Sequence, residues 1–201
     1  IAYGQHWHAF EERGRLIFQD ETGLLDLPLP NLPGAHQIQN DGAALAALRH
    51  LNLNEAAYEA AVSNDFWPSR RQRLKTGPLV EAAPQAEIWL DGGHNAAAGQ
   101  ALAAHLATLP KRPTHLVCGM LNTKDIAGYL SPMAPHVVNL TAVSIPGEAN
   151  TLAPEETVAA ATTVGLPAKP AESVEAALSS LVETAPESRI LICGSLYLAG
   201  S

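Results

Sequence analysis

Short apolar runs alternate with amphipathic segments of helical length from about residue 87 onward. The runs are typical of buried strands and lie at 88–90, 116–118, 137–143 and 190–192, with a further extended stretch near 166–170. Between them, apolar residues recur at three- and four-residue spacing, which predicts helices around 98–109, 125–135, 154–164 and 173–184. This alternation predicts βαβ units, and therefore an α/β fold with a mostly parallel sheet flanked by helices.

The first 30 residues have a different pattern. Aromatic and branched residues with hints of alternation predict strands on both sides of a turn at 20–23. A proline- and glycine-rich run at 27–34 ends this β region. A helix is then expected to begin near Asn40, and a second helix over 55–62, with Asn54 as its N-cap.

Prolines and glycines interrupt the periodicity between residues 64 and 86. We therefore expect a linker at 74–79, with one domain over 1–73 and another over 80–201. A chain of 201 residues is long enough for this arrangement without disulfide or metal support.

Charge and composition narrow the function classes. The formal net charge of −8 argues against nucleic acid and anionic membrane surfaces as partners. The sequence contains no apolar run of membrane-spanning length. Two cysteines in 201 residues make no disulfide framework, so we expect a cytoplasmic protein.

Positive charge gathers in one short segment. Four of the twelve basic residues fall within positions 70–75, namely Arg70, Arg71, Arg73 and Lys75. Such a cluster in an acidic chain is suited to hold a phosphate or carboxylate. A solvated charge run on a linker explains the same residues, so both interpretations stay open.

The turn after the predicted strand at 88–90 reads Asp91-Gly92-Gly93-His94-Asn95. The Asp91 carboxylate could accept hydrogen bonds from ribose hydroxyls, and His94 could donate to a carboxylate or phosphate. The following helix N-terminus favours anions. A tight turn, with Asn95 as N-cap, is the equal alternative, and the G-x-G-x-x-G dinucleotide fingerprint does not occur.

Two more predicted strands end in polar or glycine-rich turns, at 119–125 and 194–195. In parallel sheets ligands bind beyond the carboxyl ends of strands, so Lys124 could meet a substrate carboxylate there. Alternatively, Asp125 starts a helix and Lys124 is solvated. His6 and His8 lack the partners of a metal site, and we predict no metal ligands.

Five stretches resemble, in the same order, motifs of the folylpolyglutamate synthase/dihydrofolate synthase family of the Mur ligase superfamily. They are LPGAHQIQNDGAALAALR (32–49), WPSRRQRL (67–74), WLDGGHNAAAGQALAAHL (89–106), CGMLNTKDI (118–126) and ICGSLYLAG (192–200). The last of them distinguishes this family from the related muramyl amino-acid ligases. The resemblance implies a Rossmann-like glutamate-ligase domain over 80–201, after the β/α tail of a central ATPase domain.

The resemblance also implies a reaction. Such ligases transfer the γ-phosphate of ATP to a carboxylate, and an amine then attacks the acyl phosphate. The matched residues imply that Asn40 contacts the adenine, that Arg70 reaches the phosphates or the ribose, and that Asp91 holds the ribose or the nearby edge of the nucleotide. They imply that His94, Lys124 and Ser195 line the glutamate side of the cleft. Folate or dihydropteroate and L-glutamate are the implied substrates.

Three positions depart from the family motifs. Ser69 replaces the glycine of W-P-G-R, so the backbone there is expected to differ. Gly93 and Ala96 replace the alanine and proline of D-G-A-H-N-P, which are mild changes.

The family's P-loop and Mg²⁺ ligands belong to an amino-terminal region that this sequence does not contain. The chain is therefore expected to be a carboxyl-terminal portion, inactive without that region. Two alternatives remain: a muramyl-type amino-acid ligase, and a non-catalytic binding module with the same fold.

Overall fold

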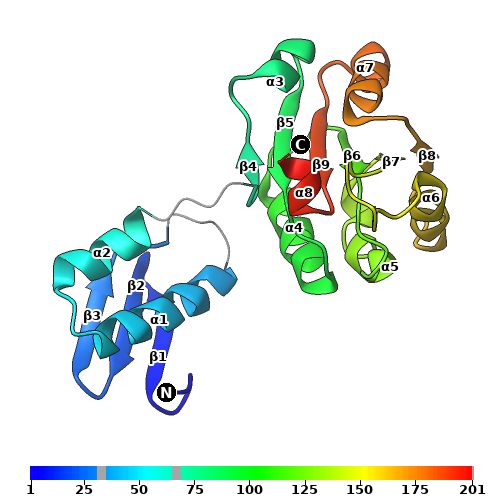
Figure 1. The fold of residues 1–201 in the computed structure, drawn as a ribbon. Helices are drawn as coiled ribbons and strands as arrows, with labels where there is room; N and C mark the ends of the chain where they lie inside the picture. The colour runs from blue at the N-terminus through cyan, green and yellow to red at the C-terminus, as the bar shows by residue number, and fades with distance from the viewer. Residues whose placement is uncertain (31–34, 65–68, 201) are drawn as a thin grey trace. The chain divides into compact units, whose positions relative to one another are not determined.

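The computed structural model describes residues 1–30, 35–64 and 69–200. Their contacts form two compact units that divide between residues 67 and 68 (Figure 1). Each unit has its own hydrophobic core, and each is described by itself.

The first unit is an antiparallel sheet covered on one face by two helices. Its strands pair in the order β1 (Trp7–Glu12), β2 (Arg15–Asp20), β3 (Gly23–Leu27), and its helices are α1 (Ala35–His50) and α2 (Glu55–Ser63). Alternate residues such as Trp7 and Ala9 of β1 and Leu16 and Phe18 of β2 enter the core. The opposite alternation leaves His8 and Phe10 exposed.

The expectations for this part are largely confirmed. Strands flank the turn at 20–23, and the Asn54 side chain caps α2 by accepting from the Ala57 amide at 3.0 Å. The start of α1 is a correction, because the helix already includes Ala35 rather than beginning near Asn40. The polar residues of its first turns hide the periodicity that begins at Gly42.

The second unit contains a six-stranded sheet in the order β4-β5-β9-β6-β7-β8. The strands are β4 (Gln72–Arg73), β5 (Glu87–Asp91), β6 (Thr114–Cys118), β7 (Asn139–Ala142), β8 (Ala168–Pro170) and β9 (Arg189–Cys193). All neighbouring pairs are parallel except β4 and β5, which are antiparallel. The predicted mostly parallel α/β fold is confirmed.

Helices cover both faces of this sheet (Figure 1). One layer contains α4 (Ala96–Thr108), α5 (Ile126–Leu130) and α6 (Pro154–Thr163), and the other contains α3 (Pro78–Ala82), α7 (Val174–Thr184) and α8 (Leu196–Ala199). Along β9, Leu191 and Cys193 pack in the first layer, whereas Ile190 and Ile192 pack in the second. Burial on both faces explains why the sequence shows unbroken apolar runs.

The helix expected over 125–135 is shorter in the structure, which is a second correction. Helix α5 ends at Leu130, and a 3₁₀ turn follows over Ala134–His136. Pro132 and Pro135 lack the backbone N–H groups that a continuous helix needs.

Close packing of α4 on α5 depends on Gly99. A Cβ at this position would overlap the backbone of Tyr129, whose side chain is fully buried in the same layer.

Among the helices of the described ranges, none is long and apolar enough to cross a membrane.

The segment before α3 belongs to the second unit. Gln72 and Arg73 pair with Leu90 and Trp89 of β5, and the Leu74 amide donates to the Ile88 carbonyl at 2.9 Å. Gln72 and Arg73, which we expected to belong to the first domain, therefore extend this sheet. The sequence did not reveal this two-residue strand because it coincides with the basic cluster.

An ion-pair network joins three strands near the amino-terminal end of the sheet. Glu87 lies between Arg189, with Nε at 3.1 Å, and Arg73, with Nη2 at 3.4 Å. The buried Arg189 also donates to the Pro110 carbonyl at 3.2 Å. Burial by itself would raise the pKa of Glu87, but the hydrogen bond from Arg189 and the charges of Arg189 and Arg73 outweigh it, so the pKa is lowered.

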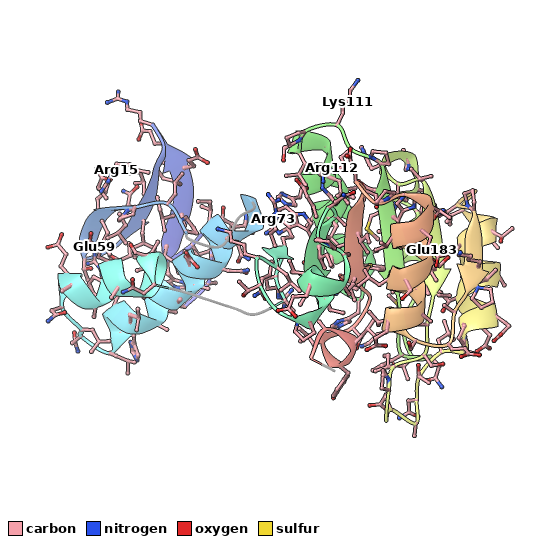
Figure 2. All side chains as sticks on the ribbon, turned by 90° about the horizontal axis from the view of Figure 1, so that it is seen from above. Arg15, Glu59, Arg73, Lys111, Arg112 and Glu183 are labelled. Carbon is pink, nitrogen blue, oxygen red and sulfur yellow. The ribbon has the colours of Figure 1, made fainter. Side chains whose placement is uncertain are left out.

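The substitution Glu87→Gln is expected to destabilise the chain by about 1–3 kcal/mol at neutral pH, because it removes the negative charge beside buried Arg189. A folded-state pKa below the unfolded value adds stability above the ordinary glutamate pKa, about 4.3, and loses it as the pH falls. The difference from wild type should therefore shrink below about pH 4 in urea unfolding. Glu183→Gln, an exposed change on α7 labelled in Figure 2, is the control. A pH-independent difference would contradict this account.

A protein comprising residues 69–201 is expected to melt cooperatively by circular dichroism, because its cores are complete within it. A version starting at residue 79 should melt several degrees lower, since it lacks β4 and the Leu74 side chain, which packs on the second core. Equal melting temperatures, or a non-cooperative transition of the longer protein, would contradict this prediction.

Candidate functional site

Three turns lie side by side at the carboxyl-terminal edge of the parallel strands. They follow β5, β9 and β6, which are consecutive in the sheet although β9 is the last of them in sequence. The turns contain His94, Ser195 and Lys124, and Asp91 is the last residue of β5; these are four of the six predicted site residues. The sequence predicts each strand end, and the strand order brings the ends together.

The turns contact one another closely. A Cβ on Gly92 would overlap Leu196 of α8, so the turns after β5 and β9 touch. Gly194 has φ +103°, and a Cβ there would lie 2.7 Å from the Gly119 carbonyl oxygen. The Gly119 amide donates to the Cys193 carbonyl at 3.2 Å, which joins the turns after β9 and β6.

The Asp91 carboxylate is buried, with only 5% of the residue exposed. Its Oδ1 accepts a hydrogen bond from the Gly93 amide at 2.7 Å, and its Oδ2 accepts one from the Arg71 amide at 2.9 Å. Burial raises the pKa of Asp91, and the two backbone hydrogen bonds and the charges of Arg70 and Arg71 only partly oppose this rise. Asp91 thus forms the turn and also holds the basic segment.

The basic segment forms a tight turn beside β5. The Ser69 carbonyl accepts from the Gly92 amide at 2.7 Å, and the Ser69 amide donates to Oε1 of Gln72 at 3.0 Å. Ser69 and Arg71 have φ of +60° and +48°, in the left-handed region. Ser69 therefore has a conformation that glycine adopts freely and other residues adopt at a cost, and the expected difference from the family's backbone stays a prediction. Between them, Arg70 is exposed.

His94 and Asn95 complete the turn after β5. The His94 ring is half-buried, and its Nδ1 lies 3.1 Å from the Gly92 carbonyl oxygen. Since a carbonyl only accepts, Nδ1 carries the proton and Nε2 is left as the acceptor of the neutral ring. Asn95 is the N-cap of α4 and accepts from the Ala98 amide at 2.9 Å, as the alternative interpretation proposed.

Lys124 and Ser195 occupy the other two turns. Lys124 is exposed, and the neighbouring Asp125 caps α5 by accepting from the Gly128 amide at 2.9 Å. Ser195 is only 4% exposed, and its Oγ accepts from the Tyr197 amide at 3.1 Å as N-cap of α8. The Ser195 hydroxyl proton can still be donated to a ligand.

Asn40 lies in the first unit, on the exposed surface of α1, where its side-chain amide donates to Oε1 of Gln37 at 2.7 Å. The remaining five predicted residues lie in the second unit.

Among the described residues, no group of three His, Cys, Asp or Glu side chains is arranged to hold a metal ion.

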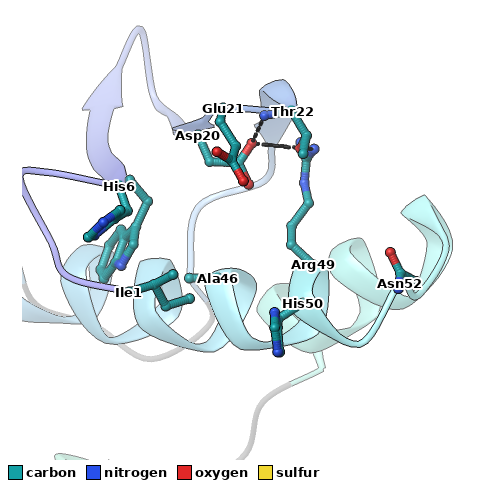
Figure 3. Close-up of a pocket in the computed structure, with 10 residues that line it drawn as sticks. Ile1, His6, Asp20, Glu21, Thr22, Ala46, Arg49, His50 and Asn52 are labelled. Atoms are coloured by element: carbon teal, nitrogen blue, oxygen red, sulfur yellow. Dashed lines mark hydrogen bonds and ion pairs between the residues drawn. The ribbon is translucent and has the colours of Figure 1, made fainter.

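The first unit also contains a polar cavity of about 350 Å³ that the sequence did not indicate (Figure 3). Arg49 lies at its rim, pairs with Asp20 at 3.5 Å and donates to the Thr22 hydroxyl. None of the six predicted residues lines this cavity. Its lining residues are Ile1, His6, Trp7, Asp20, Glu21, Thr22, Ala46, Arg49, His50 and Asn52.

Sequence reasoning missed the backbone groups that shape the main site. The Arg71 amide and the Ser69 carbonyl have no residue-type signal, because every non-proline residue carries both groups. A faint signal was the departure from glycine at Ser69 within an otherwise matching motif.

Comparison with known proteins agrees with this architecture. The family model for the carboxyl-terminal domain of dihydrofolate synthetase matches residues 80–201. The chain belongs to the folylpolyglutamate synthase/dihydrofolate synthase family. Folylpolyglutamate synthase of Lacticaseibacillus casei is 26% identical over 194 residues, which cover 93% of this chain and 42% of the relative.

Solved structures show the same fold for other members of the family. E. coli FolC in complex with DHPP and ADP has a TM-score of 0.76 and 28% identity, and the match covers 98% of this chain and 45% of FolC. Folylpolyglutamate synthase of Mycobacterium tuberculosis with ADP and AMPPCP has a TM-score of 0.77 and 25% identity. This match covers 98% of this chain and 47% of the M. tuberculosis chain. The chain thus spans less than half the length of these relatives.

A muramyl ligase is also similar over a shorter segment. UDP-N-acetylmuramoyl-L-alanine–L-glutamate ligase of Xylella fastidiosa is 41% identical over 58 residues, 29% of this chain and 12% of the relative. The family assignment therefore includes a wider relationship to Mur ligases.

The left-handed conformation of Ser69 leads to a stability prediction. Ser69→Gly should stabilise the chain by about 0.5–1 kcal/mol, because relief of backbone strain exceeds the added flexibility of the unfolded chain. Urea unfolding measures the change. The control Ser179→Gly, at an exposed position inside α7, should instead destabilise by a similar amount. Destabilisation by both changes would argue against strain at Ser69.

Proposed function

We propose that this chain is the carboxyl-terminal part of an ATP-dependent ligase that adds L-glutamate to folate or dihydropteroate. Similarity to folylpolyglutamate synthases along almost the whole chain is the observation that carries this proposal. The structures of E. coli FolC with DHPP and ADP, and with ADP but without folate substrate, support a nucleotide and a folate-type substrate. The proposed compartment is the cytoplasm.

In the proposed reaction the substrate carboxylate attacks the γ-phosphorus of ATP, which gives an acyl phosphate and ADP. The glutamate amine then attacks the acyl carbon, phosphate leaves and an amide bond forms. Catalysis of this kind depends mainly on positioning and on cationic groups near the transferring phosphoryl group. Arg70, which is exposed beside the turn after β5, is suited to the phosphate role.

The remaining predicted residues fit the anionic substrate groups. The Ser195 hydroxyl and the Lys124 ammonium offer donors to the carboxylates of glutamate at one edge of the sheet. Because Nδ1 of His94 already bonds the Gly92 carbonyl, this ring donates to a carboxylate through Nε2 only as an imidazolium. Asn40 is proposed to contact adenine and Asp91 the ribose. For Asp91 this role requires lone pairs other than those that accept the two backbone N–H groups.

The ligands of Mg²⁺ and the phosphate-cradling P-loop are proposed to lie in the remainder of the protein. The relatives are more than twice as long as the matched region, which leaves room for them. The relatives' structures include a complex with Mn, AMPPNP and L-glutamate, in line with a divalent metal and glutamate as requirements.

The decisive experiment compares this chain with a protein extended by the upstream coding sequence of its source. Each is mixed with ATP, Mg²⁺, glutamate and either dihydropteroate or a reduced folate, and ADP release is followed together with product chromatography. Only the extended protein should turn over. Product formation by the 201-residue chain alone, or none by the extended protein, would overturn the proposal.

The muramyl ligase match supports a second candidate function, addition of an amino acid to a UDP-muramoyl acceptor. It covers far less of the chain than the match to folylpolyglutamate synthase. Replacing the folate acceptor with UDP-N-acetylmuramoyl-L-alanine in the same assay separates the two functions.

In the extended protein, Arg70→Ala should lower kcat/KM for ATP by about 10²–10³, the scale of losing one oriented electrostatic donor. Lys75→Ala, an exposed change in the same cluster, should cost only a few-fold, because exposed charges are screened over about 8–10 Å. The Arg70 loss should persist at high salt. If Arg70→Ala and Lys75→Ala lowered kcat/KM equally and both losses disappeared at high salt, the basic cluster would act only through its overall electrostatic field.

A further inference from the structure

The Asp91 carboxylate connects two segments that are distant in sequence. One oxygen accepts from Gly93 in its own turn, and the other accepts from Arg71, twenty residues earlier. Arg71 lies just before β4, so this hydrogen bond is not part of the β4–β5 strand pairing. It fixes the basic segment at the point where the two strands separate.

Aspartate is suited to this position for a chemical reason. The two N–H donors meet different oxygens of the carboxylate, and an asparagine would present an NH₂ group, which cannot accept, to one of them. Burial disfavours the charged form and raises the pKa of Asp91, so the carboxylate needs compensating donors. The two backbone amides and the nearby charges of Arg70 and Arg71 provide part of this compensation.

The hydrogen bonds hold an unfavourable backbone conformation in place. Ser69 and Arg71 are both left-handed, which costs roughly 1 kcal/mol or more for each non-glycine residue. The Ser69 carbonyl and the Arg71 amide are fixed to Gly92 and Asp91, one on each side of Arg70. With both neighbours held, the direction in which Arg70 leaves the backbone is defined, while its side chain remains exposed.

We propose that Asp91 is a positioning residue: its buried carboxylate clamps the Ser69–Arg71 turn to the end of β5 and thereby holds Arg70 beside the Gly92–His94 turn. The role of Arg70 in this proposal rests on the proposed function. The hydrogen bonds by which Asp91 holds the Ser69–Arg71 turn belong to this chain and do not depend on that function. It differs from a ribose contact because Asp91 acts here on the protein backbone and through Arg70.

The first test needs no activity. Amide hydrogen exchange of the 201-residue chain, followed by NMR, should show strong protection of the Arg71 and Gly93 amides. The Arg70 amide, which has no acceptor among the described residues, should exchange fast and serves as an internal control. Fast exchange of the wild-type Arg71 amide would overturn the proposal even if no Asp91 variant folds.

The variant Asp91→Asn should raise exchange at Arg71 or Gly93 at least about tenfold, because it removes one acceptor. Core amides such as Leu191 should keep their protection. Asp125→Asn, which alters the N-cap of α5, is the matched control and should leave Arg71 unchanged. If the Arg71 and Gly93 amides both exchanged at the wild-type rate in Asp91→Asn, the proposal would be overturned.

The second test is a double-mutant cycle on kcat/KM for ATP in the extended protein. If Asp91 acts through Arg70, Asp91→Asn should lower the value in the wild-type background and cost clearly less in Arg70→Ala, where any residual loss measures the proposed ribose contact. Losses that simply multiply would show that Asp91 does not act through Arg70 and would overturn the positioning role. Absence of ligase activity would instead reject the proposed function, while the exchange data still decide the clamp.

Discussion

Burial of the parallel sheet on both faces is the constraint on which the second unit depends. Residues 116–118 of β6 and 190–193 of β9 pack alternately against one helical layer and the other, so both strands contain apolar residues at consecutive positions. Polar chemistry is thereby moved to the strand ends, where the chain leaves the sheet. The turns after β5, β6 and β9 are the places where this unit can expose donors and acceptors next to one another.

The same constraint explains how much of the fold could be predicted. Apolar runs and helical periodicity identify most elements, and Asn54, Asn95 and Ser173 mark helix starts through local hydrogen bonds. Strand order depends on pairing across long sequence separations, which no local pattern encodes. The two-residue strand β4 and the short α3 and α8 are too brief to show a period.

The residue types at the site could be read from the sequence and pointed to ligand binding. The partners of those residues in the folded chain could not be read from it. Asp91 could be selected because a carboxylate at a strand end is a plausible ligand, yet its partners are backbone amides, one of them twenty residues away. Ser195 and Asp125 could be selected as polar turn residues, and both cap helices in the structure. A side chain's local structural task and its contact with a ligand draw on the same chemistry, so sequence alone does not separate them.

The position of β9 also affects how the chain acquires its structure during synthesis. This strand lies between β5 and β6 but follows every other strand of its sheet in the described sequence. As the chain leaves the ribosome, the earlier strands emerge with the centre of the sheet still missing, and their apolar edges stay open until β9 inserts. A truncation of this chain shortly before residue 189 would therefore remove the middle of the sheet, although every other strand of the sheet remains.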